Sequence, residues 1–216
     1  MTKTDKLIML AATFAVGISA VSCGHKDNIE GSWTASAPTS IEALLPQAST
    51  ANSLLSFDFK NGQKGQPGTV MISSLLEATQ PVQPAPSDTG IVAPYEVSVS
   101  ATASVNGTWT YKDDDKDDIL ISFDMSTLNV TVDPAGVAMS ENILTGREQP
   151  EVDSLTNLTA QRWQRDFTAA VKKSLESFTI LDDVEVTGNG STLTFEVKDL
   201  RGNDRDIVLR KIIAVQ

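Results

Sequence analysis

The sequence is poor in the side chains on which many catalytic and metal sites depend. Its 216 residues include one histidine, His25, and one cysteine, Cys23. A Ser-His-Asp triad or a Cys-His pair needs a histidine that the rest of the chain does not supply. A zinc site built from histidine and cysteine is excluded for the same reason. The sequence therefore predicts a protein that is not an enzyme and that has no metal site and no cofactor.

A single cysteine also rules out a disulfide within the chain, so packing alone must stabilise the fold. Long hydrophobic runs are absent after the N-terminus. Leu7–Val21 is apolar and uncharged, and it follows a mildly basic start that contains Lys3 and Lys6. This order is typical of a secretory signal peptide, and the run is too short for a comfortable transmembrane helix of about 20 residues. We expect residues 1–22 to be cleaved on export.

The end of this segment, Ala20-Val21-Ser22-Cys23, resembles the lipobox of bacterial lipoproteins. The resemblance implies that Cys23 is acylated, becomes the first mature residue and anchors the chain to a membrane. The match departs from the family at Ala20, where leucine is preferred. Gly24, rather than aspartate, follows the cysteine, which in that family favours the outer membrane of a Gram-negative bacterium. Periplasmic and surface display both stay open, and so does the alternative of an uncleaved helix with a buried cysteine.

Positive charge is scarce. The chain has 17 basic and 28 acidic residues and a net charge of −11. Removal of Lys3, Lys6 and Asp5 takes away a net +1, which leaves −12 on residues 23–216. This charge repels nucleic acids and anionic headgroups, so we expect no nucleic-acid partner. The remaining length suits a six-residue tether, 23–28, followed by one domain, 29–216.

Alternation of apolar and polar residues is the dominant pattern of this domain, and it is typical of strands with one buried face. It recurs in about ten runs, which short polar turns separate, so we predict an all-β antiparallel meander. The runs are Gly31–Ala35, Leu55–Phe59, Val70–Ile72, Tyr95–Ala101, Trp109–Tyr111, Ile119–Phe123, Leu128–Val132, Val184–Val186, Leu193–Val197 and Asp206–Ala214. The expected turns include 105–107, 112–118, 126–127 and 188–190.

One segment departs from this alternation. Between residues 159 and 178 the apolar residues recur at steps of three and four, which predicts one amphipathic helix. Asn157 or Thr159 would cap its start. A helix that lies on a membrane surface is the alternative interpretation. We expect loops at 36–53, with a helical turn near 41–45, at the proline-rich 78–94 and at 133–158.

Acidic residues are densest in 113–118, which contains five aspartates. Their oxygen atoms could bind calcium, but the spacing lacks the glycine and the final bidentate acid of an EF-hand loop. A solvated turn that discourages edge pairing is the simpler interpretation. A glycosidase that uses a pair of carboxylates also stays open, although no pair stands out.

The segment Ile29-Glu30-Gly31-Ser32-Trp33-Thr34 resembles the Gly-x-Trp opening of the lipocalin and calycin barrels, and Asn106–Thr110 repeats the pattern. The resemblance implies a lipocalin-like β-barrel of about 8–10 strands in which Trp33 closes the bottom. Trp33 and Trp109 are then candidates for barrel closure or for ligand contact. The strands expected after Phe178 depart from the family, in which little follows the helix.

Two functions fit this reading. The first is a lipid-anchored barrel that binds a small apolar ligand, because barrels of about eight strands are either filled or hold one small molecule. The second is a non-catalytic interaction or inhibitor module that engages another envelope protein through its long loops. Its acidic surface would suit a basic partner.

Overall fold

The computed structural model describes residues 28–83, 94–112, 117–144, 146–199 and 202–213. The chain divides into two compact units, Asp27–Ile212 on the one hand and Met1–Lys26 with Ile213–Gln216 on the other. The fold described below is that of the first unit.

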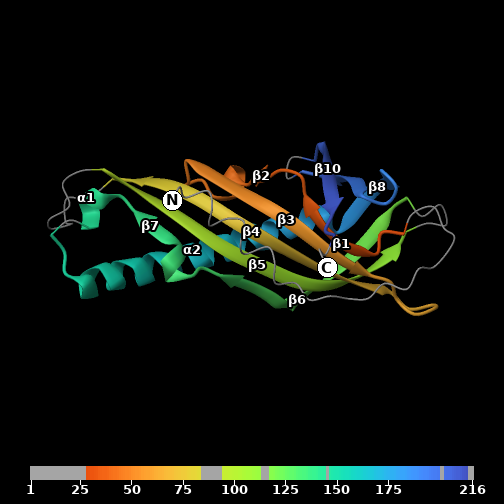
Figure 1. The fold of residues 1–216 in the computed structure, drawn as a ribbon, viewed down its shortest axis with the longest axis horizontal. Coiled ribbons are helices and arrows are strands. Elements are labelled where there is room, and N and C mark those ends of the chain that lie inside the picture. Colours follow the sequence, from red (N-terminus) through yellow and green to blue (C-terminus); the bar gives the residue numbers. More distant parts are fainter. Residues whose placement is uncertain (1–27, 84–93, 113–116, 145, 200–201, 214–216) are drawn as a thin grey trace. The chain divides into compact units, whose positions relative to one another are not determined.

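The described residues form one ten-stranded antiparallel sheet that closes in a ring (Figure 1). The order is β1-β10-β9-β8-β6-β5-β4-β3, and β1 pairs with both β10 and β3. The eight strands of the ring are β1 (Gly31–Ala35), β3 (Thr50–Lys60), β4 (Gly68–Val82), β5 (Tyr95–Tyr111), β6 (Ile119–Thr131), β8 (Ile180–Thr187), β9 (Thr192–Lys198) and β10 (Asp204–Lys211). Apart from β1 and β10, which close the ring, strands next to each other in the ring follow each other along the chain, so the prediction of an antiparallel meander is confirmed.

Three strands, β3 to β5, are long enough to extend past the ring. Beyond it, the two-residue β2 (Thr39–Ser40) takes the place of β1 beside β3. In the same way, β7 (Val137–Met139) takes the place of β6 beside β5. The sheet therefore has a closed half and an open half that share the same three central strands.

Helix α2 (Gln149–Leu175) covers the open half. In Figure 1 it runs along one face of the sheet towards β8 and β10. Ala160, Trp163, Phe167 and Ala170 are buried against alanine and valine side chains of the sheet. The short helix α1 (Glu141–Leu144) precedes it, and the 3-10 turns are η3 (Glu42–Leu44), η4 (Pro134–Gly136) and η5 (Glu176–Phe178).

Aromatic side chains fill the closed half. Phe57 lies parallel to Phe59 with 5.7 Å between ring centroids, and it meets the edges of Phe178 and Phe195 at 5.8 and 5.7 Å. Trp33, which is fully buried, belongs to the same core. Offset and edge-to-face contacts of this kind are the favourable geometries for aromatic pairs. The closed ring thus encloses a packed aromatic core.

The helix is longer than the sequence pattern predicts. It begins at Gln149 after the N-cap residue Glu148, with a proline in its first two positions, and neither Asn157 nor Thr159 is its cap. The apolar stripe did not reveal these turns because Val152 and Leu155 are only partly buried and Leu158 is 62% exposed. The sequence signal for the start of α2 was Pro150, because proline is favoured in the first turn of a helix. The predicted loop 133–158 is therefore mostly helix and turn, together with β7.

The predicted turns at 105–107 and 126–127 are also wrong, because the first lies inside β5 and the second inside β6. Asn106-Gly107 is part of β5, where the β5–β6 register shifts between Ser104 and Asn106. Across this shift, Thr127 Oγ1 accepts a hydrogen bond from the Asn106 amide and donates one to the Asp124 carbonyl. A Cβ on Gly107 would lie 2.8 Å from the Ser122 carbonyl oxygen, so the glycine allows close approach of β6. The turn residues form a bulge here instead of a hairpin.

The predicted loops at 36–53 and 78–94 are shorter than expected. Strand β3 begins at Thr50, and η3 supplies the helical turn that we expected near 41–45. Strand β4 continues to Val82, and it includes Pro81. Proline is tolerated there because β3 pairs with β4 only as far as Thr79, so that β4 is an edge strand beyond that residue. Residues 84–93 lie outside the described part of the chain.

Other predictions are confirmed. Gly31–Ala35 is the first strand, residues 188–190 form the turn between β8 and β9, and three strands follow Phe178.

Replacement of Phe57 tests the aromatic core. Phe57→Ala should lower the free energy of unfolding by about 3–5 kcal/mol, because it removes the ring that Phe59, Phe178 and Phe195 all contact. Urea denaturation followed by fluorescence measures this loss. Met125→Ala, at a side chain that is 43% exposed, should stay within about 0.5 kcal/mol. A loss below about 1 kcal/mol for Phe57→Ala would show that the ring is loosely packed.

Candidate functional site

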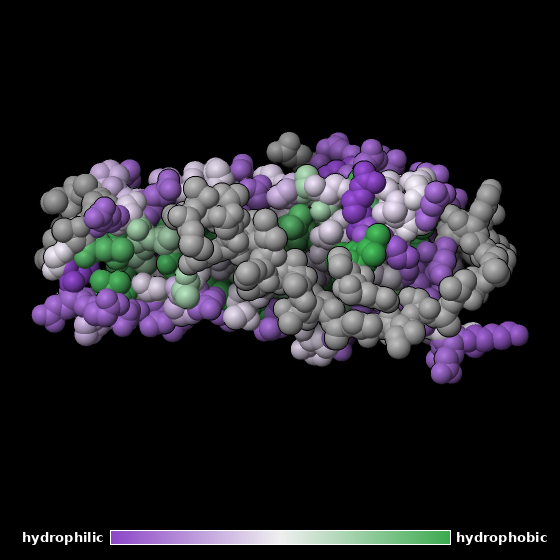
Figure 2. Space-filling view, in the orientation of Figure 1, coloured by the Kyte–Doolittle hydropathy of each residue, from purple (hydrophilic) through white to green (hydrophobic). Residues whose placement is uncertain are grey.

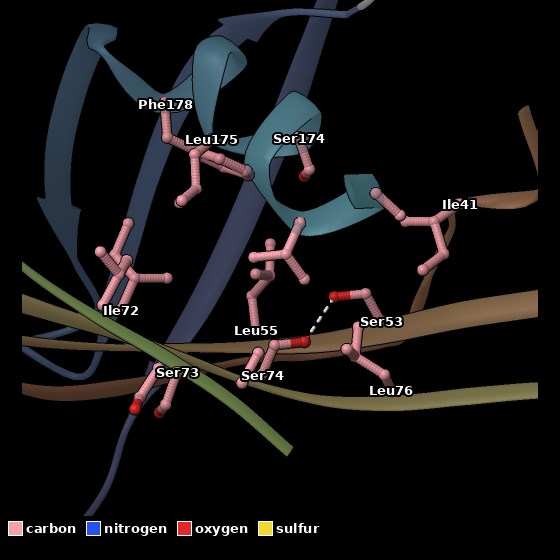
Figure 3. A pocket seen from close by; sticks show the side chains of 15 residues that line it. Ile41, Ser53, Leu55, Ile72, Ser73, Ser74, Leu76, Ser174, Leu175 and Phe178 are labelled. Carbon is pink, nitrogen blue, oxygen red and sulfur yellow. Dashed lines mark hydrogen bonds between the residues drawn. The ribbon is translucent and has the colours of Figure 1, made fainter. Parts of the chain in front are cut away.

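A small cavity lies beneath the C-terminal half of α2, at the boundary between the two halves of the sheet (Figure 3). On the ring side it is lined by Leu55, Ile72 and Phe178, which belong to the aromatic core. On the open side its lining includes Ala103 and Ala170, which belong to the core beneath the helix. The cavity therefore marks the place where the two hydrophobic cores meet but do not fill the space between them.

Side-chain size explains why space is left there. Ser74 faces Leu55 on one side and Ala103 on the other, so one inward row of the sheet passes from a large to two small side chains. The helix presents Ala170 and Ser174 opposite this row. Small side chains on both walls keep the helix and the sheet from meeting fully.

The polar groups of the cavity are hydroxyls. Ser53 Oγ and Ser74 Oγ lie 2.7 Å apart and form a hydrogen bond, which Figure 3 shows beneath the helix. Ser53 is buried although it is polar. The other lining residues are apolar or serine, and none is charged. An apolar cavity with a few converging polar groups is the usual composition of a site for a small ligand.

The cavity is small in this conformation. Its volume is about 30 Å³, which suffices for two or three water molecules at about 10–15 Å³ each. Sites for small organic ligands commonly have volumes of about 300–1,000 Å³. A ligand larger than water would therefore enter only if α2 moved away from the sheet.

Trp33 and Trp109 lie in the same core but do not line this cavity. Trp33 Nε1 donates to the Ile29 carbonyl at 2.8 Å, and the Lys211 ammonium lies 5.1 Å from the centre of the Trp33 ring. Trp109 Nε1 donates to the Lys60 carbonyl at 3.2 Å, and a Cβ on Gly68 would lie 2.2 Å from this nitrogen. Both indoles are thus held by backbone acceptors of neighbouring segments.

Two buried side-chain nitrogens have no hydrogen-bond partner among the residues that the structure describes: Trp163 Nε1 and Arg205 Nε. Trp163 belongs to α2, and its side chain is fully buried between the helix and the sheet. An unsatisfied buried donor costs about 1–3 kcal/mol. Arg205 is in register with the buried Val197, and burial holds the pKa of its guanidinium below the usual value, against the opposing effect of Asp199. Both nitrogens are therefore buried donors whose hydrogen-bonding capacity the described residues do not satisfy.

The outer face of β8, β9 and β10 is acidic. Glu196 is in register with Asp182 on one side and with Asp206 on the other. Desolvation raises the pKa of Glu196, and repulsion from Asp183, Asp206 and Asp204 raises it further, while Lys198 opposes the shift. Like charges directly opposite each other destabilise a sheet. This row of carboxylates therefore lowers the stability of the fold at neutral pH.

Other predicted site residues are only partly described. Cys23 and His25 lie outside the described residues, as do Asp113, Asp114 and Asp115 of the acidic turn. Asp118 accepts a hydrogen bond from Lys112 Nζ at 2.7 Å, and this bond is the main cause of the lowered pKa of its carboxyl. In the described part of the chain no three histidine, cysteine, aspartate or glutamate side chains gather as a metal ion would require.

Comparisons with known proteins identify no relative. No protein-family model matches the chain, and neither does any curated protein or solved structure. Among the helices that the structure describes, none combines the length and the apolar character needed to cross a membrane.

Sequence reasoning did not find the cavity. Its hydroxyls come from β3 and β4, and its small residues from β5 and α2, so their proximity depends on pairing between distant segments. One signal was present, because Ser53 and Ser74 occupy inward positions of their strands, where the alternation calls for apolar residues.

Neutralisation of Glu196 tests the acidic face. Because the folded state holds the pKa of this carboxyl above its unfolded value, the penalty is absent in acid and complete at neutral pH. Glu196→Gln should therefore raise the melting temperature at pH 7, and the gain should vanish near pH 3 and shrink in about 1 M salt. Glu77→Gln is the control, because it faces Asn52 and Ser100. An equal gain at both pH values would contradict a charge effect.

Proposed function

We propose that the chain is a lipid-anchored envelope lipoprotein whose lipocalin-like barrel binds a small apolar molecule beneath α2. The observation that carries this proposal is the apolar cavity between the helix and the three long strands. A closed ring of eight antiparallel strands supports the barrel interpretation, since barrels of that size either fill with side chains or hold one small ligand. We propose further that the protein is not an enzyme.

The packing of the ring determines where such a ligand would bind. Trp33, Phe57, Phe59, Phe178 and Phe195 belong to one packed core between the ring strands, so a ligand among them would have to displace large side chains. Beneath α2 the sheet presents alanine and serine instead, so less side-chain volume must be displaced. The boundary cavity is therefore the favoured site.

Movement of α2 would enlarge the site. The covering half of the helix contributes the small side chains Ala170 and Ser174, and its regular turns end at Leu175, where η5 begins. In its first turns, Val152 and Leu155 are only partly buried. Figure 2 shows hydrophobic surface at the end of the sheet where these turns and α1 lie. The first turns of α2 thus pack less tightly against the rest of the fold than its turns from Ala160 to Leu175.

Native mass spectrometry tests the binding proposal. Residues 23–216 carrying Cys23→Ser, purified without detergent, should carry a small molecule that denaturation releases. Ala103→Val should reduce this load, because the added methyl groups fill the cavity. Ala101→Val is the matched control, since Ala101 lies on the same face of the same strand but does not line the cavity. A clean protein mass before denaturation would count against ligand binding.

The lipid anchor has its own test. Cells supplied with an alkyne-labelled palmitate should incorporate the label into the chain and retain the protein in the membrane fraction. Cys23→Ser should lose the label and release the protein, because stable attachment needs acyl chains. Label that persists in the Cys23→Ser variant would contradict acylation at this residue.

The packed ring also favours a second candidate, an interaction or inhibitor module that holds no ligand. The like-charged row around Glu196 is present although it lowers stability, and an acidic surface would steer association with a basic envelope protein. In this case the mass spectrum would show no released molecule, and cross-linking in cells would capture a basic partner on β8–β10.

A further inference from the structure

We propose that the site beneath α2 selects uncharged molecules that carry a hydrogen-bond acceptor, such as acyl esters, over free carboxylates, and that the Ser53–Ser74 pair binds this acceptor. This inference rests on the proposed function and names the chemical class of its ligand.

The first argument is the absence of charge. The fifteen side chains drawn in Figure 3 are apolar or serine, so no lysine or arginine is available within this lining to pair with an anion. Lys173, the neighbour of Ser174 on α2, forms an ion pair with Glu176 and lines a different hollow on the surface. Burial of an unpaired carboxylate in an apolar site is far more costly than burial of a neutral ester or ketone.

The second argument is the count of protons in the serine pair. Two hydroxyls carry two donor protons, and the bond between Ser53 and Ser74 uses one of them. It is the one hydrogen bond that these side chains make with the described residues. One proton is therefore left to donate to a guest in the cavity. A carbonyl oxygen would accept it, whereas an alkane has no acceptor to offer.

The third argument is the arrangement of the walls. The serine pair lies on the sheet at the open-half side of the cavity, whereas Leu175 and Phe178 point from the helix end towards Ile72 on the ring side (Figure 3). This arrangement places the acceptor of a ligand next to the serines and its apolar part against the helix.

The test compares three probes of equal chain length on the mature chain, residues 23–216 with Cys23→Ser. Methyl decanoate, decanoic acid and decane are titrated separately at pH 7.5, and native mass spectrometry measures the bound fraction. The ester should bind at least about tenfold more tightly than the acid, because the acid is ionised at this pH.

Variants then assign the preference to the serine pair. Ser53→Ala/Ser74→Ala should weaken ester binding about two- to tenfold, the effect of one neutral hydrogen bond, and should not weaken decane binding. The matched control is Thr79→Val/Ser98→Ala, which removes a second cross-strand hydroxyl pair, 3.2 Å apart, from the outer face of β4 and β5. Near-ultraviolet circular dichroism checks that each variant is folded.

The outcomes separate the two proposals. Equal binding of ester and acid, or ester binding that survives loss of both serines, overturns the neutral-acceptor inference and leaves ligand binding intact. An equal loss of ester and decane binding in the serine variant also overturns it, because the pair would then act through structure alone. Failure of all three probes to bind overturns the proposed function as well. If the serine variant does not fold, the comparison of ester with acid on the parent chain decides.

Discussion

The pairing of β1 with both β3 and β10 is the constraint on which the rest of the structure depends. Five residues, Gly31–Ala35, satisfy the edges of two strands that would otherwise be open. Trp33 is in register with Phe57 on one side and with Lys211 on the other, so the same strand contributes a large, fully buried side chain to the core. Closure and packing are thereby coupled, because a sheet that is not closed cannot enclose the aromatic cluster.

The opposite joint of the ring, between β6 and β8, is short. Two residue pairs form it, Ile119 with Leu181 and Leu120 with Ile180, and backbone bonds from Ile121 to Thr179 and from Val184 to Asp117 extend it. Helix α2 lies between these two strands in the sequence, so the covering helix and the shortest joint belong to the same connection. A displacement of α2 would therefore reach the ring at the joint with the fewest strand pairs.

Much of the fold could be predicted from the sequence, because most strands show an alternation of apolar and polar residues that is visible in a short stretch of the chain. The alternation around Trp33 and from Leu193 to Val197 requires only neighbours in the chain. Asn106-Gly107 was misread because a local turn signal competed with pairing to β6, which the sequence does not display. The start of α2 was missed because its first turns bury few side chains. The cavity could not be predicted at all, since its walls meet only through the register of β3, β4 and β5.

Ring closure also imposes a delay on the newly made chain, because β1 cannot pair with β10 until β10 has been synthesised. Ala35 pairs with Leu209, and 209 − 35 = 174 residues separate them. At about 5–20 residues per second, the first strand of the ring waits roughly 9–35 seconds for its last partner to be synthesised. During that interval the free edge of β1, and β3 behind it, can pair with another chain, which is the route to edge-to-edge aggregation. Closure of the ring therefore competes with self-association, and a chaperone that keeps β1 and β3 from pairing with other chains would favour closure.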